Sequence, residues 1–244
     1  MFTFYEVGGK VRDELLGIKS KDIDFVAVFD TDKIPPNRRI EDLFDLLVHY
    51  LKETGYEIFL TTPKMYTIRA KFPKDHKYAG TTADFVIARK EIGYKEGTRE
   101  PILVPGSLHD DLARRDFTIN AIAKAEDGSY YDPFDGASDL KAGILRTPIS
   151  GDITFADDPL RILRAIRFAI TKGFLISHDI DEIITHFDYE NDFKCISEER
   201  IREELYKCFK HDTLATIFML EDYRDLQKYV FRHTKLWLKP TNEQ

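Results

Sequence analysis

The chain has 244 residues and a formal net charge of −7, with 43% hydrophobic and 32% charged residues. This composition predicts an ordinary soluble globular protein with one large domain or two smaller ones. The acidic balance argues against a general attraction to nucleic acid, although a local basic surface remains compatible with it. No apolar run approaches the length of a membrane span, and the start MFTFYEV lacks signal-peptide features.

The two cysteines, Cys195 and Cys208, have a spacing that matches no zinc site. The chain is also too long to be a disulfide scaffold. We therefore expect both to be buried thiols in helices, and we expect a reducing, cytoplasmic setting.

Strand and helix patterns alternate along the first half of the chain. Glycine, proline and charged residues are concentrated at 91–106, where we expect a mobile loop, and 30–39 also has loop composition. Alternating and helical hydrophobic periodicities predict the remaining elements. These are strands at 2–7, 23–29, 56–60, 65–72 and 83–88, and helices at 11–16 and 40–53.

Long segments of helical periodicity fill the second half, at 159–172, 180–187, 198–211 and 213–229. The overall prediction is an α+β head followed by an all-α region.

Asp22 and Asp24 interrupt a strand that is otherwise apolar. Side chains at i and i+2 of a strand point to the same face, so the two carboxylates project together. Neighbouring carboxylates repel unless a cation lies between them, and oxygen ligands of this kind suit Mg²⁺. The alternative is a half-exposed strand on which both aspartates are solvated.

The preceding Gly8-Gly9 pair lies between a strand and a helix, where backbone N–H groups can approach a phosphate. Arg12 in the first helical turn can add a charge-assisted contact. A third carboxylate, Asp84, interrupts a later apolar strand, and we expect it to act as the base for an attacking hydroxyl. A plain strand-edge aspartate is the open alternative for Asp84.

Six stretches, in order, resemble the bacterial-type tRNA nucleotidyltransferases and poly(A) polymerases of the DNA polymerase β superfamily. They are GGKVRDELLG with DIDFV, ADFVIARKE, DLARRDFTINAIA, DPFDGASDLKAGILR, FADDPLRILRAIRFA and ISEERIREEL. The resemblance implies a polymerase-β-like head with a mixed sheet at 1–147 and a helical neck at 148–212, which selects the base and binds RNA. It leaves a shortened C-terminal helical segment at 213–244.

The resemblance also implies a reaction: addition of nucleotides from CTP and ATP to the 3′ end of tRNA. We expect this reaction to use Mg²⁺ in a two-metal mechanism. Poly(A) addition, or another RNA 3′-terminal transfer, is an alternative within the family. A non-catalytic nucleotide- or RNA-binding module is an alternative outside it. Asp22 and Asp24 would bind the metal ions. The triphosphate and ribose contacts would come from Gly8, Gly9, Arg12, Arg115, Asp116 and Asn120.

Base selection is predicted at Asp158 and Arg161, which are i and i+3 neighbours if both lie on one helix. A carboxylate accepts hydrogen bonds and a guanidinium donates them, which matches the amino group and ring nitrogen of cytosine or adenine. The alternative is a helix cap, a role that we assign to Asp157. Arg164 can share the ligand, and the resemblance places Arg167 near it, although an ion pair would explain Arg167 equally well.

In ISEERIREEL, we expect Ser197 to cap the helix, and Glu199, Arg200 and Glu204 to organise the neck rather than to catalyse. We expect the family's usual tRNA-holding body and tail to be reduced or missing, and a homodimer could compensate for them. The basic and aromatic stretch at 226–244 could stack bases, but aromatic packing of a helix end is the favoured interpretation.

Overall fold

The structure is a computed structural model that describes residues 2–20, 22–30, 39–94 and 101–234. The chain divides into two compact units, Met1–Lys141 and Ala142–Gln244. None of the helices in these described ranges is both long and apolar enough to cross a membrane. The further division of the second unit into a neck and a C-terminal segment stays a prediction.

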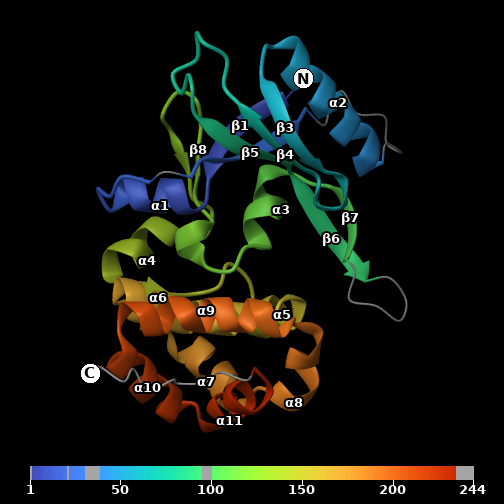
Figure 1. The fold of residues 1–244 in the computed structure, drawn as a ribbon. Helices are drawn as coiled ribbons and strands as arrows, with labels where there is room; N and C mark the ends of the chain where they lie inside the picture. The colour runs from blue at the N-terminus through green and yellow to red at the C-terminus, as the bar shows by residue number, and fades with distance from the viewer. Residues whose placement is uncertain (1, 21, 31–38, 95–100, 235–244) are drawn as a thin grey trace, which may run out of the picture. The chain divides into compact units, whose positions relative to one another are not determined.

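The first unit is built on a seven-stranded mixed sheet with strand order β3-β4-β5-β2-β1-β8-β9 (Figure 1). β2 and β5 run parallel, while the other neighbouring pairs in this sheet are antiparallel. The strands are β1 Phe2–Val7, β2 Asp24–Phe29, β3 Glu57–Thr62, β4 Thr67–Lys71, β5 Thr82–Ile87, β8 Ala123–Lys124 and β9 Tyr130–Tyr131.

Helix α2 (Ile40–Glu53) covers one face of this sheet. Its Leu43, Leu47 and Leu51 recur every four residues and are fully buried in a core with Phe25 and Phe85. The opposite face carries a smaller core that includes Leu112 of α3. The other helices of this unit are α1 Gly9–Leu15, α3 Leu108–Ala113 and α4 Gly136–Ala142, with 3₁₀ turns at Pro63–Met65 and Thr118–Asn120.

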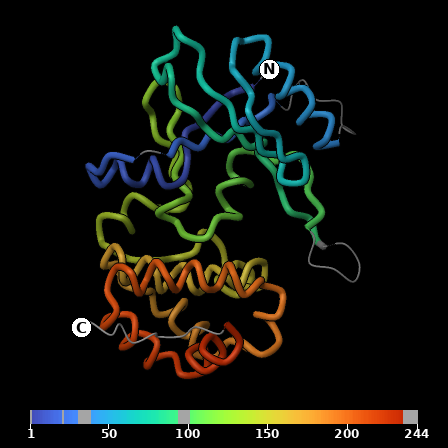
Figure 2. The backbone as a smooth tube through the Cα atoms, in the orientation of Figure 1, coloured from blue at the N-terminus to red at the C-terminus, as the bar shows by residue number. Residues whose placement is uncertain are grey.

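The second unit is helical, apart from a two-stranded parallel sheet of β10 (Ile144–Leu145) and β11 (Leu175–Ile176). Helices α6 and α9 pack along each other (Figure 2). Ser197 caps α9 by accepting the Arg200 N–H at 3.4 Å, as predicted. The helices are α5 Gly151–Asp157, α6 Leu160–Lys172, α7 His178–His186, α8 Tyr189–Asp192, α9 Glu198–His211, α10 Thr213–Asp222 and α11 Arg224–His233, with a 3₁₀ turn at Phe193–Cys195.

The prediction of a mobile loop at 91–106 is wrong for the residues of that range that the structure describes. They belong to an antiparallel pair of strands, β6 (Arg89–Tyr94) and β7 (Pro101–Pro105), whose cross-strand bonds satisfy the backbone despite the Gly and Pro content. Gly106 follows the pair at a close approach, because a Cβ there would lie 2.7 Å from the Arg89 carbonyl carbon.

The single helix predicted at 213–229 is also wrong, because Tyr223 breaks it into α10 and α11. The backbone of Tyr223 is not helical (φ −110°, ψ 68°), and its hydroxyl donates to Asp181 of α7 at 2.6 Å. Cys208 is buried as predicted, whereas Cys195 is exposed at the end of a 3₁₀ turn.

Two predicted features fall partly outside the described residues. Of the loop at 30–39, the structure describes the two end residues. Of the stretch at 226–244, it describes the part up to residue 234, where Tyr229 is buried against Phe193, in agreement with aromatic packing.

Candidate active site

The carboxylate pair lies at the start of β2, with Asp24 as the first strand residue and Asp22 just before it. Ile23 and Phe25 point into the core beneath α2, so the two aspartates share the opposite side of the chain, as the alternation predicts. Asp24 is in register with Asp84 on the parallel strand β5. Asp22, Asp24 and Asp84 together line one cavity of about 420 Å³.

The environment of Asp24 disfavours its charged form. Burial raises the pKa of the Asp24 carboxyl, and the charges of Asp84 and Asp22 raise it further, while Arg115 and Arg69 oppose the shift. A cation beside this carboxylate would relieve the same repulsion.

Asp84 is held by an arginine that the sequence analysis did not single out. Arg69 of β4 lies opposite Asp84 in the sheet register, and it donates from Nε at 2.7 Å and from Nη2 at 2.6 Å. This two-pronged pair fixes the orientation of the carboxylate at the cavity. An arginine inside a strand gives no signal of its own, because the sequence does not reveal the strand register.

The Gly8 turn brings the end of β1 beside the carboxylates. Gly8 has φ 71° and ψ −138°, a conformation that favours glycine. A Cβ at this position would lie 3.3 Å from Arg115 Nη1 and 3.7 Å from Asp24 Oδ2. The structure therefore gathers Gly8, Arg115, Asp24 and Asp84, four of the predicted site residues. Gly9 begins α1 directly after the turn.

Three other predicted contacts form a buried hydrogen-bond network. Arg12 donates to Asn120 Oδ1 at 2.7 Å, and Asn120 donates in turn to Asp116 Oδ1 at 3.0 Å. Arg12 also binds Asp13 through Nη2 at 2.7 Å. All three predicted residues are under 9% exposed, and Arg115 Nη1 donates to the Asn120 carbonyl at 3.4 Å, which joins this network to the site. Direct contacts from Arg12, Asp116 and Asn120 to a nucleotide stay predictions.

Asp111 is a second residue that the sequence analysis missed. It is fully buried and accepts from Arg114 Nη2 at 2.5 Å and from Arg115 Nη2 at 3.1 Å. These two charges outweigh the effect of burial, so the pKa of Asp111 is lowered. Its spacing of three and four residues from the arginines on a helix was a readable signal. The Nε of Arg115 is buried, with no hydrogen-bond partner among the described residues.

In the second unit, Asp158 lies just before α6 with an extended backbone, so it is not a helical neighbour of Arg161. Its Oδ1 accepts the Leu160 N–H at 3.2 Å, and its Oδ2 accepts from Arg200 at 3.1 Å. The carboxylate that binds the helix start is thus Asp158, and the cap assigned to Asp157 is wrong. Arg161 donates to the Thr154 carbonyl at 3.1 Å.

The remaining arginines of α6 lie near Phe168. The guanidinium carbon of Arg167 lies 4.6 Å from the Phe168 ring centroid, and that of Arg164 lies 5.9 Å away. Arg167 Nε also donates to Glu204 at 2.5 Å, which is the ion pair that the sequence left open for it. Nucleotide contact by either arginine stays a prediction.

The donor set in the first unit fits a divalent cation, since Asp22 and Asp24 offer oxygen ligands in one cavity, and a cation there would offset the burial and the like charges that raise the pKa of Asp24. Among the residues that the structure describes, no group of three or more His, Cys, Asp or Glu side chains is arranged to hold a metal ion. The engagement of Asp84 with Arg69 is consistent with that finding.

Curated relatives and solved structures resemble this chain over most of its length. The multifunctional CCA protein of Nitrosomonas eutropha is 36% identical over 204 residues, which is 82% of this chain and 42% of that protein. The CCA-adding enzyme of Buchnera aphidicola subsp. Schizaphis graminum is 35% identical, over 84% of this chain and 44% of that enzyme. The chain thus spans under half the length of these two curated relatives.

A structure of the Thermotoga maritima CCA-adding enzyme complexed with tRNA matches with a TM-score of 0.69 and 27% identity, over 98% of this chain and 50% of that one. A tRNA nucleotidyltransferase complexed with a primer tRNA and an ATP analogue matches with a TM-score of 0.68 and 29% identity, over 94% and 59%. These matches confirm the predicted α+β head followed by a helical region. The family model for the poly A polymerase head domain covers residues 4–146, more than half of the chain, and the chain therefore belongs to that family.

Proposed function

We propose that this chain adds C and A nucleotides, CCA or part of it, to the 3′ end of tRNA from CTP and ATP without a template. The observation that carries the proposal is the meeting of Asp24, Asp84 and Arg115 around the Gly8 turn in the first unit. Carboxylates for a metal ion and a guanidinium for a phosphate are the groups that nucleotidyl transfer needs.

In the proposed reaction, Arg115 and the backbone at Gly8 and Gly9 hold the triphosphate. The buried Nε of Arg115 supports this role, because a donor with no acceptor within the described part of the chain suits an incoming phosphate oxygen. Asp22 and Asp24 would hold Mg²⁺, which would polarise the phosphate and neutralise charge on the leaving pyrophosphate. Asp84, oriented by Arg69, accepts the proton of the RNA 3′-hydroxyl while the hydroxyl oxygen bonds to the α-phosphorus and the bond from the α-phosphorus to the pyrophosphate oxygen breaks.

We propose further that Asp158 and Arg161 select the base. Cytosine and adenine each present an amino donor beside a ring-nitrogen acceptor, which suits one carboxylate and one guanidinium. Uracil and guanine reverse that pattern and would leave buried groups unpaired, at a cost of about 1–3 kcal/mol each. The names of the relatives favour the CCA reaction, while the name of the matching head domain keeps poly(A) addition as an alternative.

Incubation with tRNAs that lack A, CA or CCA, and with each labelled triphosphate in turn, tests the proposal. We expect CTP and ATP to be incorporated in a fixed number, and Asp24→Asn to lower the rate by roughly a hundredfold or more. Asp45→Asn on the exposed face of α2 is the matched control, with the same chemical change outside the site.

Unlimited ATP incorporation would favour the poly(A) alternative. UTP and GTP incorporation as efficient as that of CTP and ATP would refute the base-selection argument. Nucleotide binding with no incorporation into any RNA would favour a non-catalytic module.

We also propose a homodimer, supported by three apolar side chains of α9 and α10 that are more than 60% exposed, Tyr206, Leu214 and Phe218. Light scattering should give twice the chain mass, and Leu214→Glu should reduce it to a single chain. A single-chain mass for the unmodified protein would refute the dimer.

A further inference from the structure

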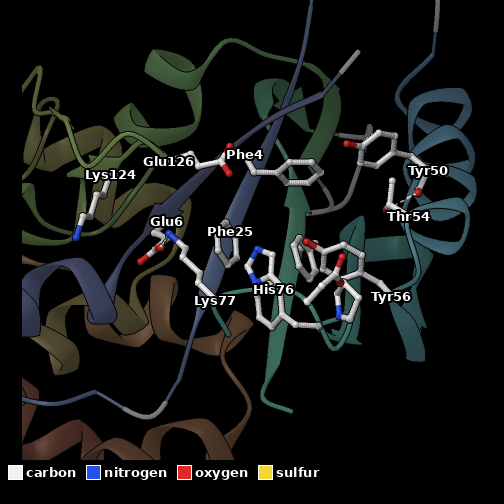
Figure 3. A pocket seen from close by; sticks show the side chains of 14 residues that line it. Phe4, Glu6, Phe25, Tyr50, Thr54, Tyr56, His76, Lys77, Lys124 and Glu126 are labelled. Carbon is white, nitrogen blue, oxygen red and sulfur yellow. Dashed lines mark hydrogen bonds and ion pairs between the residues drawn. The ribbon is translucent and has the colours of Figure 1, made fainter. Parts of the chain in front are cut away.

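A second cavity, of about 290 Å³, lies in the first unit on the side of the sheet covered by α2 (Figure 3). Phe25 and Phe85 line it, and they directly follow Asp24 and Asp84 along their strands. Because successive strand residues face opposite sides, the cavity lies across the sheet from the carboxylates. The proposed nucleotidyl transfer makes no use of it.

Aromatic rings form one part of the wall of this cavity, beside its charged side chains. Phe4 and Tyr50 are stacked with their centroids 5.8 Å apart, and Phe72 and His76 are stacked at 4.4 Å. Tyr56 meets its neighbours through tilted and edge contacts. The π-face of an aromatic ring carries partial negative charge, so a set of such rings attracts a cation that has left water.

The lysines that line the cavity are already paired with carboxylates. Lys77 donates to Glu6 at 3.1 Å, and Lys124 forms an ion pair with Glu14. Glu6 is 3% exposed and also binds Lys10. Burial alone would raise the pKa of Glu6, but these hydrogen bonds lower it, so its charge is retained and matched. Little positive charge is therefore left over for an anionic ligand.

Two other carboxylates at the cavity remain uncompensated. Asp75 and Glu126 both line it and are exposed, and neither has a hydrogen bond or ion pair to any residue in the described ranges. Burial, Tyr50 and these two negative charges raise the pKa of Tyr56 to about 12. The two carboxylates therefore act electrostatically on the Tyr56 hydroxyl, which also lines the cavity. Figure 3 shows Glu126 near Phe4, on one side of the group of rings.

We propose that this aromatic pocket binds a small organic ammonium ion, with its apolar substituents against the rings and its charge facing Asp75 and Glu126. Ring faces and unpaired carboxylates both favour a cation. A phosphate-bearing ligand would instead face the two unpaired carboxylates with its own negative charge. The volume is at the small end of the range for ligand pockets, which suits a compact ion.

Choline and its neutral carbon analogue, 3,3-dimethylbutan-1-ol, are the probes that separate charge from shape. Titration of the full chain, followed by calorimetry and by ligand-observed NMR, should show choline binding about 2- to 30-fold more tightly than the alcohol. The double variant Asp75→Asn/Glu126→Gln should reduce that preference without abolishing it, because the ring faces still favour the cation. Both side chains are exposed, so the fold should tolerate the change.

The matched control is Asp45→Asn/Glu221→Gln, which changes the net charge by the same amount at exposed positions outside the pocket. It should keep the preference for choline. Equal binding of choline and the alcohol, or binding of neither, would overturn the proposal. So would binding of adenosine in place of choline, which would identify a pocket for a planar base.

Discussion

Replacement of Asp111 by Asn tests the construction of the candidate site most directly. Asp111 is fully buried and receives three N–H donors, two from Arg114 at 3.1 and 2.5 Å and one from Arg115 at 3.1 Å. Arg115 in turn lies beside the Gly8 turn. We expect Asp111→Asn to destabilise the first unit and to weaken triphosphate binding.

The size of the effect follows from the burial of the group. Loss of one partner of a buried ion pair costs about 3–5 kcal/mol, because the remaining charge is left uncompensated. An amide oxygen can still accept from one arginine, so we expect the low end, about 3 kcal/mol. Against a typical total stability of about 5–15 kcal/mol, the variant should fold yet unfold at clearly lower urea concentration.

Urea unfolding followed by far-UV circular dichroism measures the stability loss, and the KM for CTP and ATP reports the placement of Arg115. Asp110→Asn is the matched control, since it makes the same change one residue earlier at a partly exposed helix cap. A double-mutant cycle with Arg115→Met should show coupling, because the methionine carries no charge that could pair with Asp111. Unchanged unfolding and unchanged KM in Asp111→Asn would refute the reasoning.

Three further predictions concern other contacts of the two units. Gly8→Ala should cost about 1–3 kcal/mol, because φ 71° with ψ −138° is strained for alanine, and it should raise the KM for triphosphate; unchanged melting and KM would contradict this. Arg69→Met should lower the Mg²⁺ concentration for half-maximal incorporation, because it removes a positive charge from the cavity that Asp22 and Asp24 line, whereas Lys71→Met on the same strand should not. Burial alone would raise the pKa of Glu204, but its ion pairs lower that pKa below 4.5. The ionised carboxylate should therefore contribute fully to the free energy of unfolding above pH 4.5, and that contribution should be lost as the pH falls. Glu204→Gln should remove that part of the pH dependence in urea unfolding, and parallel curves for both proteins would contradict the assignment.

The strands and helices with strong periodicity were predicted well. The bounds predicted for α2 and α9 agree with the structure, because each has a continuous apolar stripe and a clear start or end. The β6–β7 pair was missed because its stability comes from cross-strand hydrogen bonds, which leave little trace in local composition. The break at Tyr223 was missed for a similar reason, since a partner on α7 holds that residue.

At the candidate site, local sequence predicted the residues whose role depends on near neighbours. The alternation at Asp22 and Asp24 and the turn at Gly8 are properties of short segments, and the structure brings these residues together. Arg69 could not be found in this way, because it reaches Asp84 through the pairing of β4 with β5. Asp111 could have been found, since its two arginines follow it at helical spacing.

The contacts of Asp158 are compatible with the base-selection proposal, and they specify which of its acceptor sites a base could use. An ionised carboxylate has about four acceptor sites, and Asp158 uses one on the Leu160 N–H and one on Arg200. Acceptor capacity therefore remains for the amino group of a base. Its two existing bonds, one to a helix start and one to a neighbouring helix, fix the direction in which the remaining lone pairs point. A cap and a base reader are thus compatible roles for one residue, because the bonds that hold the helix start also preorganise the acceptor.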